Sequence, residues 1–214
     1  MKKIAVLGSG GVGKVLADGF LALGHEVVRG SREPAKLEEW KKGAGARASV
    51  ASFEAAAAGA EVVLLAVKGS AAEQVVETCG EALAGKTVLD ATNPIADEEP
   101  ENGVIRFFTG PNESLMERLQ KRAPKAHFVK AFSCVGNALM VRPNLRGGRP
   151  TMFICGNDPD AKLEARAFLE QLGWDSEDLG KATAARAIEP LCMLWCIPGF
   201  LHNDWMHALK MLRA

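Results

Sequence analysis

The chain has 214 residues, 48% of them hydrophobic and 24% charged, and its 26 basic and 26 acidic side chains leave no formal net charge. This composition is typical of a folded protein with a complete hydrophobic interior, and the balanced charge provides no general attraction to nucleic acid or to an acidic membrane surface. Its five cysteines have no regular spacing, which favours a reducing cytoplasm over a disulfide framework. We expect neither a secretory signal nor a membrane-spanning helix.

Short apolar segments alternate with helical patterns along most of the chain. The strand around 62–67 lacks polar alternation, so both of its faces are expected to be covered. The alternation predicts a doubly wound, Rossmann-type parallel α/β sheet with a small C-terminal helical segment. Strands are predicted at Lys3–Leu7, Glu26–Arg29, Glu61–Val67, Lys86–Asp90, His127–Phe132 and Thr151–Cys155, with an edge strand at Glu177–Leu179.

Helices are predicted where apolar residues recur at spacings of three and four. The first helix follows the first strand and is expected to stop at Gly24. Ser52 and Ser70 fit N-cap positions, and Pro198 is expected to break or kink the last helix. The other helices are expected at Pro34–Lys42, Phe53–Ala58, 70–83, Leu115–Lys121 and Asp160–Leu172, and over most of Thr183–Leu212.

A glycine-rich segment, GSGGVGK at 8–14, lies between the first strand and the first helix and matches G-x-G-x-x-G. In that context Gly8 permits a tight turn, Gly10 lets the backbone approach a pyrophosphate, and Gly13 lets the helix pack closely on the sheet. The free N–H groups at the start of the helix then face the phosphates. The segment predicts a dinucleotide site formed by Gly8, Ser9, Gly10, Gly11, Val12 and Gly13.

The end of the second strand indicates which dinucleotide binds. A site for NAD usually carries a carboxylate there for the ribose 2′-hydroxyl, but Gly30 stands at that place. Ser31 offers a hydroxyl and Arg32 a guanidinium suited to a 2′-phosphate, and Lys36 adds a second positive charge. The sequence therefore favours NADP(H) over NAD(H).

Several segments together resemble the NADP-dependent oxidoreductases that use the 8-hydroxy-5-deazaflavin coenzyme, coenzyme F420. The resemblance covers nearly the whole chain. It implies reversible hydride transfer between NADP(H) and the deazaflavin, and often a homodimer. The segments are GSGGVGK, GHEVVRGSREPAKL at 24–37, DATNP at 90–94, VKAF at 129–132, CGNDPDAK at 155–162, and matching positions at 178–180, 185–186 and 189–191.

The resemblance also assigns residues to the cofactor by position. It implies that the glycine loop holds the pyrophosphate and that the positions after the second strand hold the 2′-phosphate. It divides the chain into an NADP-binding domain, 1–180, and a helical cap or dimerisation segment, 181–214. The remaining cofactor contacts that it implies are Ala66, Val67 and Lys68 at the ribose or adenine, Thr92, Asn93 and Pro94 near the nicotinamide, and Asn137 and Ala138 over the carboxamide.

The segment after the fifth predicted strand departs from the family pattern. It reads Ser133-Cys134-Val135-Gly136-Asn137, where archaeal members have a His and a Pro-Ala run near the deazaflavin. Because this segment lacks the residues that lie near the deazaflavin in archaeal members, the hydride acceptor is expected to be either a deazaflavin or a flavin, both of which are planar. Two alternatives remain: an NADP(H) sensor without turnover, and a reductase of a small carbonyl or imine. The carbonyl and imine enzymes need a long helical second domain, and only about 30 residues follow the last predicted strand.

No catalytic residue is assigned. Hydride transfer between two rings needs stacking and exclusion of water rather than a strong acid or base. If a proton is required, Ser133 and His202 are the candidates. The loop 96–110 is either a substrate loop or a plain surface connection.

The apolar C-terminal segment offers residues for both packing and a ligand. Cys192 and Cys196 are expected to be packing residues rather than metal ligands, and Cys134 is not expected to act as a nucleophile. The larger side chains Leu191, Leu194, Trp195 and Phe200 are expected in the core or a dimer face, with Trp195 or Met193 flooring the second substrate pocket as the alternative.

Overall fold

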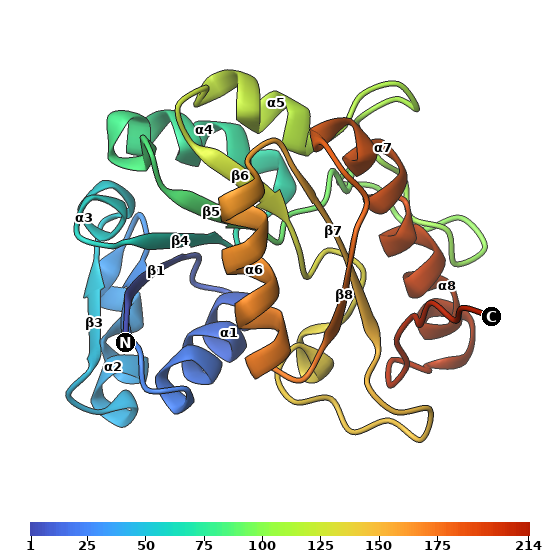
Figure 1. The fold of residues 1–214 in the computed structure, drawn as a ribbon, viewed down its shortest axis with the longest axis horizontal. Helices are drawn as coiled ribbons and strands as arrows, with labels where there is room; N and C mark the ends of the chain where they lie inside the picture. Colours follow the sequence, from blue (N-terminus) through green and yellow to red (C-terminus); the bar gives the residue numbers. More distant parts are fainter.

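The computed structural model describes all 214 residues and contains one eight-stranded sheet (Figure 1). The strand order is β3-β2-β1-β4-β5-β6-β7-β8, so the chain reverses its direction of sheet growth between β1 and β4. That reversal is the switch point at which open α/β sheets bind ligands. The strands are β1 (Lys3–Leu7), β2 (Glu26–Gly30), β3 (Ala48–Ala51), β4 (Val62–Leu65), β5 (Thr87–Asp90), β6 (His127–Lys130), β7 (Thr151–Gly156) and β8 (Asp175–Asp178).

The register aligns the carboxyl ends of the central strands. Leu7 pairs with both Gly30 and Leu65, Leu65 pairs with Asp90, and Asp90 pairs with Lys130. These five residues form one row across β2, β1, β4, β5 and β6. The loops that leave the row therefore all begin at the same edge of the sheet.

Helices cover both faces of the sheet (Figure 1). One face packs against α1 and α6, and the other against α3, α4 and α5. The helices are α1 (Gly11–Ala22), α2 (Glu38–Ala44), α3 (Phe53–Ala58), α4 (Gly69–Cys79), α5 (Leu115–Arg122), α6 (Pro159–Gln171), α7 (Ala185–Ile188) and α8 (Leu191–His202), with 3-10 turns η1 (Pro34–Leu37), η2 (Gly80–Leu83), η3 (Asn137–Leu139) and η4 (Ala182–Ala184).

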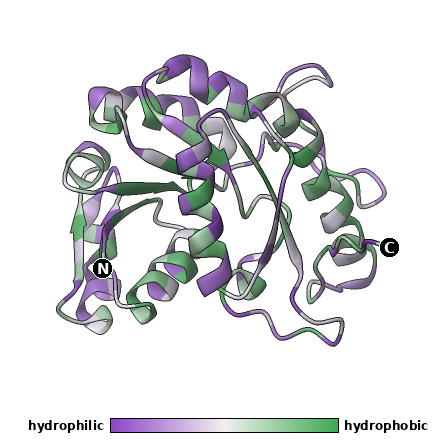
Figure 2. Cartoon of the chain, viewed as in Figure 1, coloured by the Kyte–Doolittle hydropathy of each residue, from purple (hydrophilic) through white to green (hydrophobic).

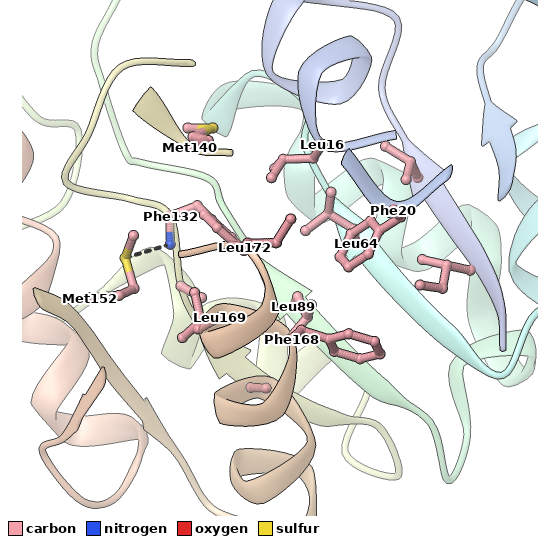
Figure 3. Close-up of a cluster of buried hydrophobic side chains, with 14 of the residues drawn as sticks. Leu16, Phe20, Leu64, Leu89, Phe132, Met140, Met152, Phe168, Leu169 and Leu172 are labelled. Atoms are coloured by element: carbon pink, nitrogen blue, oxygen red, sulfur yellow. Dashed lines mark hydrogen bonds between the residues drawn. The ribbon is translucent and has the colours of Figure 1, made fainter. Parts of the chain in front are cut away.

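The hydrophobic interior lies in two large clusters, one on each face of the sheet. In the first, Phe20 of α1 meets Phe168 of α6 edge to face with ring centroids 5.3 Å apart, and Leu64 and Leu89 of the sheet lie beside them (Figure 3). Figure 2 shows the central strands β1 and β4 as hydrophobic along their length, whereas hydrophilic and hydrophobic residues are mixed on helices such as α5 and α6. Burial on both faces explains why these strands lack polar alternation.

The last third of the chain differs most from the prediction. Helix was expected over most of Thr183–Leu212, but α8 ends at His202, where Asn203 adopts the left-handed conformation with φ of 53°. The helix continues through Pro198 rather than breaking there. It ends because the chain turns back: Trp205 packs on Gly199, where a Cβ atom would lie 2.3 Å from the indole ring. The last twelve residues have no regular secondary structure.

The sheet differs from the prediction in two places. The strand β3 was not predicted, because ASVA is short and weakly apolar. The sheet is not wholly parallel either, since β6 and β7 pair antiparallel. A parallel connection needs a crossover helix, and the chain between these two strands forms only η3.

Smaller differences concern helix starts. The helix α4 begins at Gly69 with Lys68 as its N-cap, so Ser70 does not cap it, whereas Ser52 does cap α3 by accepting a hydrogen bond from the Ala55 N–H. The short helix predicted over Pro34–Lys42 is present as the 3-10 turn η1, which begins at Pro34, followed directly by α2. The stretch Ala182–His202 has the length and the mean hydropathy, 1.3, of a membrane-crossing helix, although Cys192, Trp195 and Cys196 within it are buried in the protein.

Candidate functional site

The glycine loop joins β1 to α1 at the switch point of the sheet. Gly8 has φ of 147°, and a Cβ atom there would lie 2.2 Å from the carbonyl oxygen of Ala66. A Cβ atom at Gly13 would lie 2.6 Å from the carbonyl oxygen of Gly8, so the start of α1 packs directly on the loop. Gly10 has open space around its Cα, and no side chain caps α1. The free N–H groups of the helix are left for a ligand, as an anion site requires.

A cavity of about 600 Å³ opens beside this loop. Its volume lies within the range of small-molecule and cofactor sites. It contains nine of the predicted contacts, in three segments that follow β1, β2 and β4. They are Gly8, Ser9, Gly10, Ser31, Arg32, Lys36, Ala66, Val67 and Lys68. The cavity is completed by residues that were not predicted: Glu33, Ser52, Phe53, Glu54, Ala71, Gln74, Val75 and Thr78.

The charges at the β2 end of this cavity fit a 2′-phosphate. Arg32 is exposed at the cavity wall, directly after the buried Ser31. The Lys36 ammonium lies 2.7 Å from a carboxylate oxygen of Glu33, and that hydrogen bond lowers the pKa of the Glu33 carboxyl. Lys36 would therefore have to share its charge with Glu33 when it meets a phosphate, whereas Arg32 forms no ion pair.

The other predicted contacts lie outside this cavity: Gly11, Val12 and Gly13 in the first turn of α1, and the rest on the loops after β5 and β6. The side-chain amide of Asn93 donates to the carbonyl oxygen of Ser133 at 2.7 Å, which ties the two loops together. Asn137 lies beside the glycine loop, with its Nδ2 3.1 Å from where a Cβ atom on Gly11 would stand. Of the neighbouring contacts, Val12 is half-buried, Ala138 is exposed, and Thr92 and Pro94 are buried.

Two buried polar atoms on these loops have no hydrogen-bond partner: Asn93 Oδ1 and Ser133 Oγ. Ser133 is 2% exposed. The preceding residue, Phe132, has φ of 61°, which is strained for a bulky side chain, and its N–H donates to the sulfur of Met152 at 3.1 Å (Figure 3). Unpaired buried polar atoms and backbone strain both gather at functional sites. The Asn93 oxygen can accept a hydrogen bond, and the Ser133 hydroxyl can donate one. Together they fit a ligand that has both a hydrogen-bond donor and a hydrogen-bond acceptor, such as a carboxamide.

A buried ionic network fixes the loop that carries Asn93. The Lys130 ammonium lies 2.7 Å from Asp90 and 2.9 Å from Glu189, and it donates to the carbonyl oxygen of Thr92 at 2.9 Å. Asp90 accepts from both the N–H and the hydroxyl of Thr92. Burial alone would lower the pKa of Lys130, but the two carboxylates outweigh it and raise that pKa. Every polar group of Thr92 is thus held in place.

Glu189 links this network to a distant helix. Its two carboxylate oxygens accept from the N–H groups of Leu115 and Met116, at the start of α5. The three ionic residues Asp90, Lys130 and Glu189 were not predicted to act together. A signal was present, because Asp90 and Lys130 are charged residues that end otherwise apolar strands. Glu189, far along the chain, carries no such signal.

The loop 96–110 forms one wall of a second cavity, of about 660 Å³. Phe107 pairs with Ile95 in an antiparallel bridge, and the Phe108 N–H donates to the carbonyl oxygen of Pro94, so the loop is fastened to the segment that follows Asn93. The opposite wall includes Glu189 and Met193 of the C-terminal segment. Of the two expectations for the loop, the structure supports a wall of a pocket rather than a plain connection.

Helix α8 packs against the same loops. Trp195 is buried, and its ring lies 2.6 Å from where a Cβ atom on Gly136 would stand. Leu194 and Phe200, expected in the core or at a dimer face, are 56% and 48% exposed, whereas Leu191 is half-buried against the main core. His202 is exposed at the end of the helix, so the structure leaves it in solvent rather than beside Ser133.

The cysteines in this region are buried thiols. Burial raises the pKa of Cys134 to about 11, which leaves the thiol protonated near neutral pH and a poor nucleophile. A hydrogen bond between Cys192 and Cys196 raises the pKa of the first thiol and lowers that of the second. Both pack with Ile105 and Trp195 in a small hydrophobic cluster.

A glycine loop at the switch point, next to a cavity of this size, is the arrangement of a Rossmann-type nucleotide-binding protein. The comparisons with known proteins agree. The sequence model of the family described as NADP oxidoreductase, coenzyme F420-dependent, matches residues 3–94. The crystal structure of a proposed F420-dependent NADP reductase from Arthrobacter sp. FB24 has a TM-score of 0.92 and 33% sequence identity to this chain, and the match covers 100% of both chains. The chain belongs to this family of NADP-dependent oxidoreductases.

More distant relatives differ in their length. Metalloreductase STEAP3 from Rattus norvegicus is 31% identical over 208 residues, which is 93% of this chain and 39% of that protein. The chain thus spans about two fifths of the length of this curated relative. A reductive aminase from Aspergillus terreus, solved with NADPH and ethyl-5-oxohexanoate, has a TM-score of 0.69 at 21% identity, over 95% of this chain and 63% of that one. At that identity the likeness concerns the fold alone.

Proposed function

We propose that this protein transfers a hydride between NADP(H) and a planar deazaflavin or flavin acceptor. The observation that carries the proposal is the pair of unpartnered buried atoms, Asn93 Oδ1 and Ser133 Oγ, on loops that leave the same sheet edge as the glycine loop. An amide oxygen and a hydroxyl complement the NH₂ and C=O of a nicotinamide carboxamide. That match supports assigning the cofactor's reactive end to the β5 and β6 loops.

The adenosine end of the cofactor is assigned to the 600 Å³ cavity. The glycine loop and the start of α1 would hold the pyrophosphate through N–H groups. Arg32 would pair with the 2′-phosphate, with Ser31 and Lys36 beside it. The glycine at the end of β2 leaves no carboxylate at the position that binds the 2′-hydroxyl of NAD.

NADPH, when bound, supplies the hydride, and the acceptor ring supplies the atom that receives it. The residues of this chain have to hold the two rings at about 3–3.5 Å and exclude water. The loop of Asn93, fixed through Thr92 by Asp90 and Lys130, provides a rigid support for one ring. Reduction of the acceptor also takes up one proton, and we assign its transfer to the Ser133 hydroxyl, because the other candidate, His202, is exposed at the end of α8.

The acceptor is assigned to the side of the cleft bounded by the loop 96–110 and α8. The 660 Å³ cavity lies there, and its walls combine apolar side chains such as Ile105, Phe107 and Met193 with charged ones such as Arg186. A planar ring with polar substituents fits such a lining. Arg186 is held by a paired hydrogen bond to Glu117.

The decisive experiment follows the loss of NADPH absorbance with a panel of acceptors: the deazaflavin coenzyme, FMN, FAD, riboflavin, an iron(III) chelate, and a ketone with and without an amine. Turnover with the deazaflavin or a flavin supports the proposal. Iron(III) reduction that occurs only when a flavin is added also supports it. Turnover with the ketone or imine alone overturns it, and tight NADPH binding without turnover of any acceptor favours the sensor alternative.

We further propose a cytoplasmic homodimer that associates through α8 and the residues after it. This surface exposes Leu194, Phe200, Leu201 and Met206, each at least 48% exposed. Several exposed apolar side chains on one segment are what an interaction surface supplies. Sedimentation velocity of the wild type and of Leu194→Glu tests this: a dimer that the substitution dissociates supports it, and a monomeric wild type overturns it.

A further inference from the structure

Beneath the glycine loop lies a buried arginine that the sequence analysis did not single out. Arg29, on β2, is 2% exposed. Its Nη2 donates to the carbonyl oxygen of Gly8 at 3.0 Å and approaches that of Gly10 at 3.4 Å. Arg29 is not among the residues that line the nucleotide cavity. Its guanidinium therefore contacts the loop from the side opposite to the ligand.

The surroundings of Arg29 leave its charge largely uncompensated. The guanidinium carbon lies 4.9 Å above the ring of Trp40, and the Nε atom has no hydrogen-bond partner. Burial lowers the pKa of Arg29, whereas the charge of Asp18 raises it. Asp18 is itself bonded to Lys14 at 2.8 Å and to the indole N–H of Trp40 at 2.7 Å. A buried charge without a dedicated counter-ion is costly, so its presence calls for a role.

We infer that Arg29 is a positioning residue for the pyrophosphate of the dinucleotide. In a planar trans peptide the C=O of one residue and the N–H of the next point in opposite directions. By holding the carbonyl of Gly8 on the side away from the ligand, Arg29 turns the N–H group of Ser9 toward the ligand side. The carbonyl of Gly10 is held mainly by α1, since it accepts from the Lys14 N–H at 3.0 Å and lies 3.4 Å from Arg29. Its positive charge behind the loop also favours a dianionic pyrophosphate in front of it.

The third glycine of the loop has a matching role. A Cβ atom at Gly13 would lie 3.5 Å from Arg29 Nη2, as well as 2.6 Å from the carbonyl oxygen of Gly8. The close contact is with the Gly8 carbonyl, which also accepts the Arg29 hydrogen bond, whereas 3.5 Å from Nη2 is an ordinary contact distance. The absence of a side chain at Gly13 therefore leaves the Gly8 carbonyl in the position where Arg29 bonds it.

The test compares NADPH with adenosine 2′-monophosphate, which carries the 2′-phosphate and lacks the pyrophosphate. For Arg29→Met we expect NADPH affinity to fall at least about tenfold, as loss of a charged hydrogen bond implies, and adenosine 2′-monophosphate affinity to change less than about twofold. Arg29→Lys, which keeps the charge, should recover part of the NADPH affinity. Arg32→Ala should weaken both ligands, because it acts on the phosphate they share.

The matched control is Arg47→Met. Arg47 donates to the carbonyl oxygen of Leu21, at the other end of α1, and should leave both affinities unchanged. Equal loss of both ligands in Arg29→Met, or no loss of either, overturns the inference. The inference rests on the proposed function: a wild-type protein that binds neither ligand overturns both, whereas normal wild-type binding with an unaffected Arg29→Met variant overturns the inference alone.

Discussion

The two ends of the dinucleotide cleft are built in different ways. The proposed adenosine end takes Arg32 and Lys36, the residues assigned to the 2′-phosphate, from a short stretch of chain after β2, and both are exposed. The proposed nicotinamide end takes Asn93 and Ser133 from two separate loops, and the loop of Asn93 is held by a buried ionic network that includes Glu189, from a third part of the chain. The side chains of the first, adaptable end are exposed and free to move, and a short stretch of sequence is enough to identify them. The second end is rigid, and its residues come together only in the complete fold.

The largest expected effect comes from breaking the rigid end. Lys130→Met removes one partner of a fully buried ionic network, which typically costs about 3–5 kcal/mol. For a chain of this size that lowers the melting temperature by about 10 °C. The control is Lys125→Met, since Lys125 is 70% exposed in its pair with Glu81 and should change the melting temperature by about 1 °C at most. Equal melting temperatures for the two variants would show that the network is not the support inferred here.

The adaptable end should respond in binding without loss of stability. Arg32→Ala is expected to weaken NADPH by about 10- to 100-fold, the range for a lost charged hydrogen bond, and to change NADH less than about twofold. Isothermal titration calorimetry with both coenzymes measures this. Lys42→Ala, at an exposed residue of the neighbouring helix, serves as the control. An equal fall for NADPH and NADH would remove the assignment of the 2′-phosphate to Arg32.

At Ser133 we expect a smaller effect, in which a substitution raises stability and lowers activity. Its buried hydroxyl has no partner, so Ser133→Ala should stabilise the ligand-free protein by about 1 kcal/mol and raise its melting temperature by about 2–4 °C. The same change should lower kcat/KM about tenfold, since the hydroxyl is assigned to the cofactor. Ser70→Ala, at an exposed serine, should do neither. A destabilised variant with full activity would contradict the proposal on both counts.

The smallest effect lies in the scaffold, away from both ends. Burial lowers the pKa of His25, whose Nδ1 accepts from the Lys2 N–H and whose ring packs between Phe20 and Phe168. As the pH falls, His25 therefore takes up a proton in the unfolded chain before it does so in the folded protein. This stabilisation is complete above about pH 6.5 and is lost as the pH falls below it.

Thermal melts between neutral pH and mild acid measure this contribution. His25→Phe should flatten the pH dependence of the melting temperature by about 2 °C over that interval, whatever its absolute stability. The exposed His202→Gln variant should follow the wild-type profile. A His25→Phe profile that runs parallel to the wild type would assign the pH dependence to other groups.

The contrast between the two ends of the cleft also explains which features could be predicted from the sequence. The glycine loop, the Ser31-Arg32 pair and seven of the eight strands follow from local patterns, and they were predicted. The partnership of Lys130, Asp90 and Glu189 depends on sheet register and on where the chain returns after about 60 residues, which no local pattern encodes. The unpaired Ser133 hydroxyl and the strain at Phe132 exist only in the folded chain.

Two other features were not predicted: the antiparallel pairing of β7 and the end of α8 at His202. The antiparallel β7 followed from the lack of a crossover helix, which the sequence shows only as a long loop. The end of α8 depends on Trp205 folding back on Gly199, a contact between side chain and backbone that helical periodicity does not contain. Both differences arose where tertiary contacts decided a local choice.

Glu189 sets a limit on how proteins of this kind can be cut and recombined. One carboxylate satisfies an ammonium in the sheet and two amides at the start of α5. A chimera that joined residues 1–180 to a foreign C-terminal part would leave these groups without their partner, so the junction is not a free modular boundary. Any replacement segment has to bring an acidic residue to that same point, a requirement that a designer can screen for before choosing an acceptor-binding part.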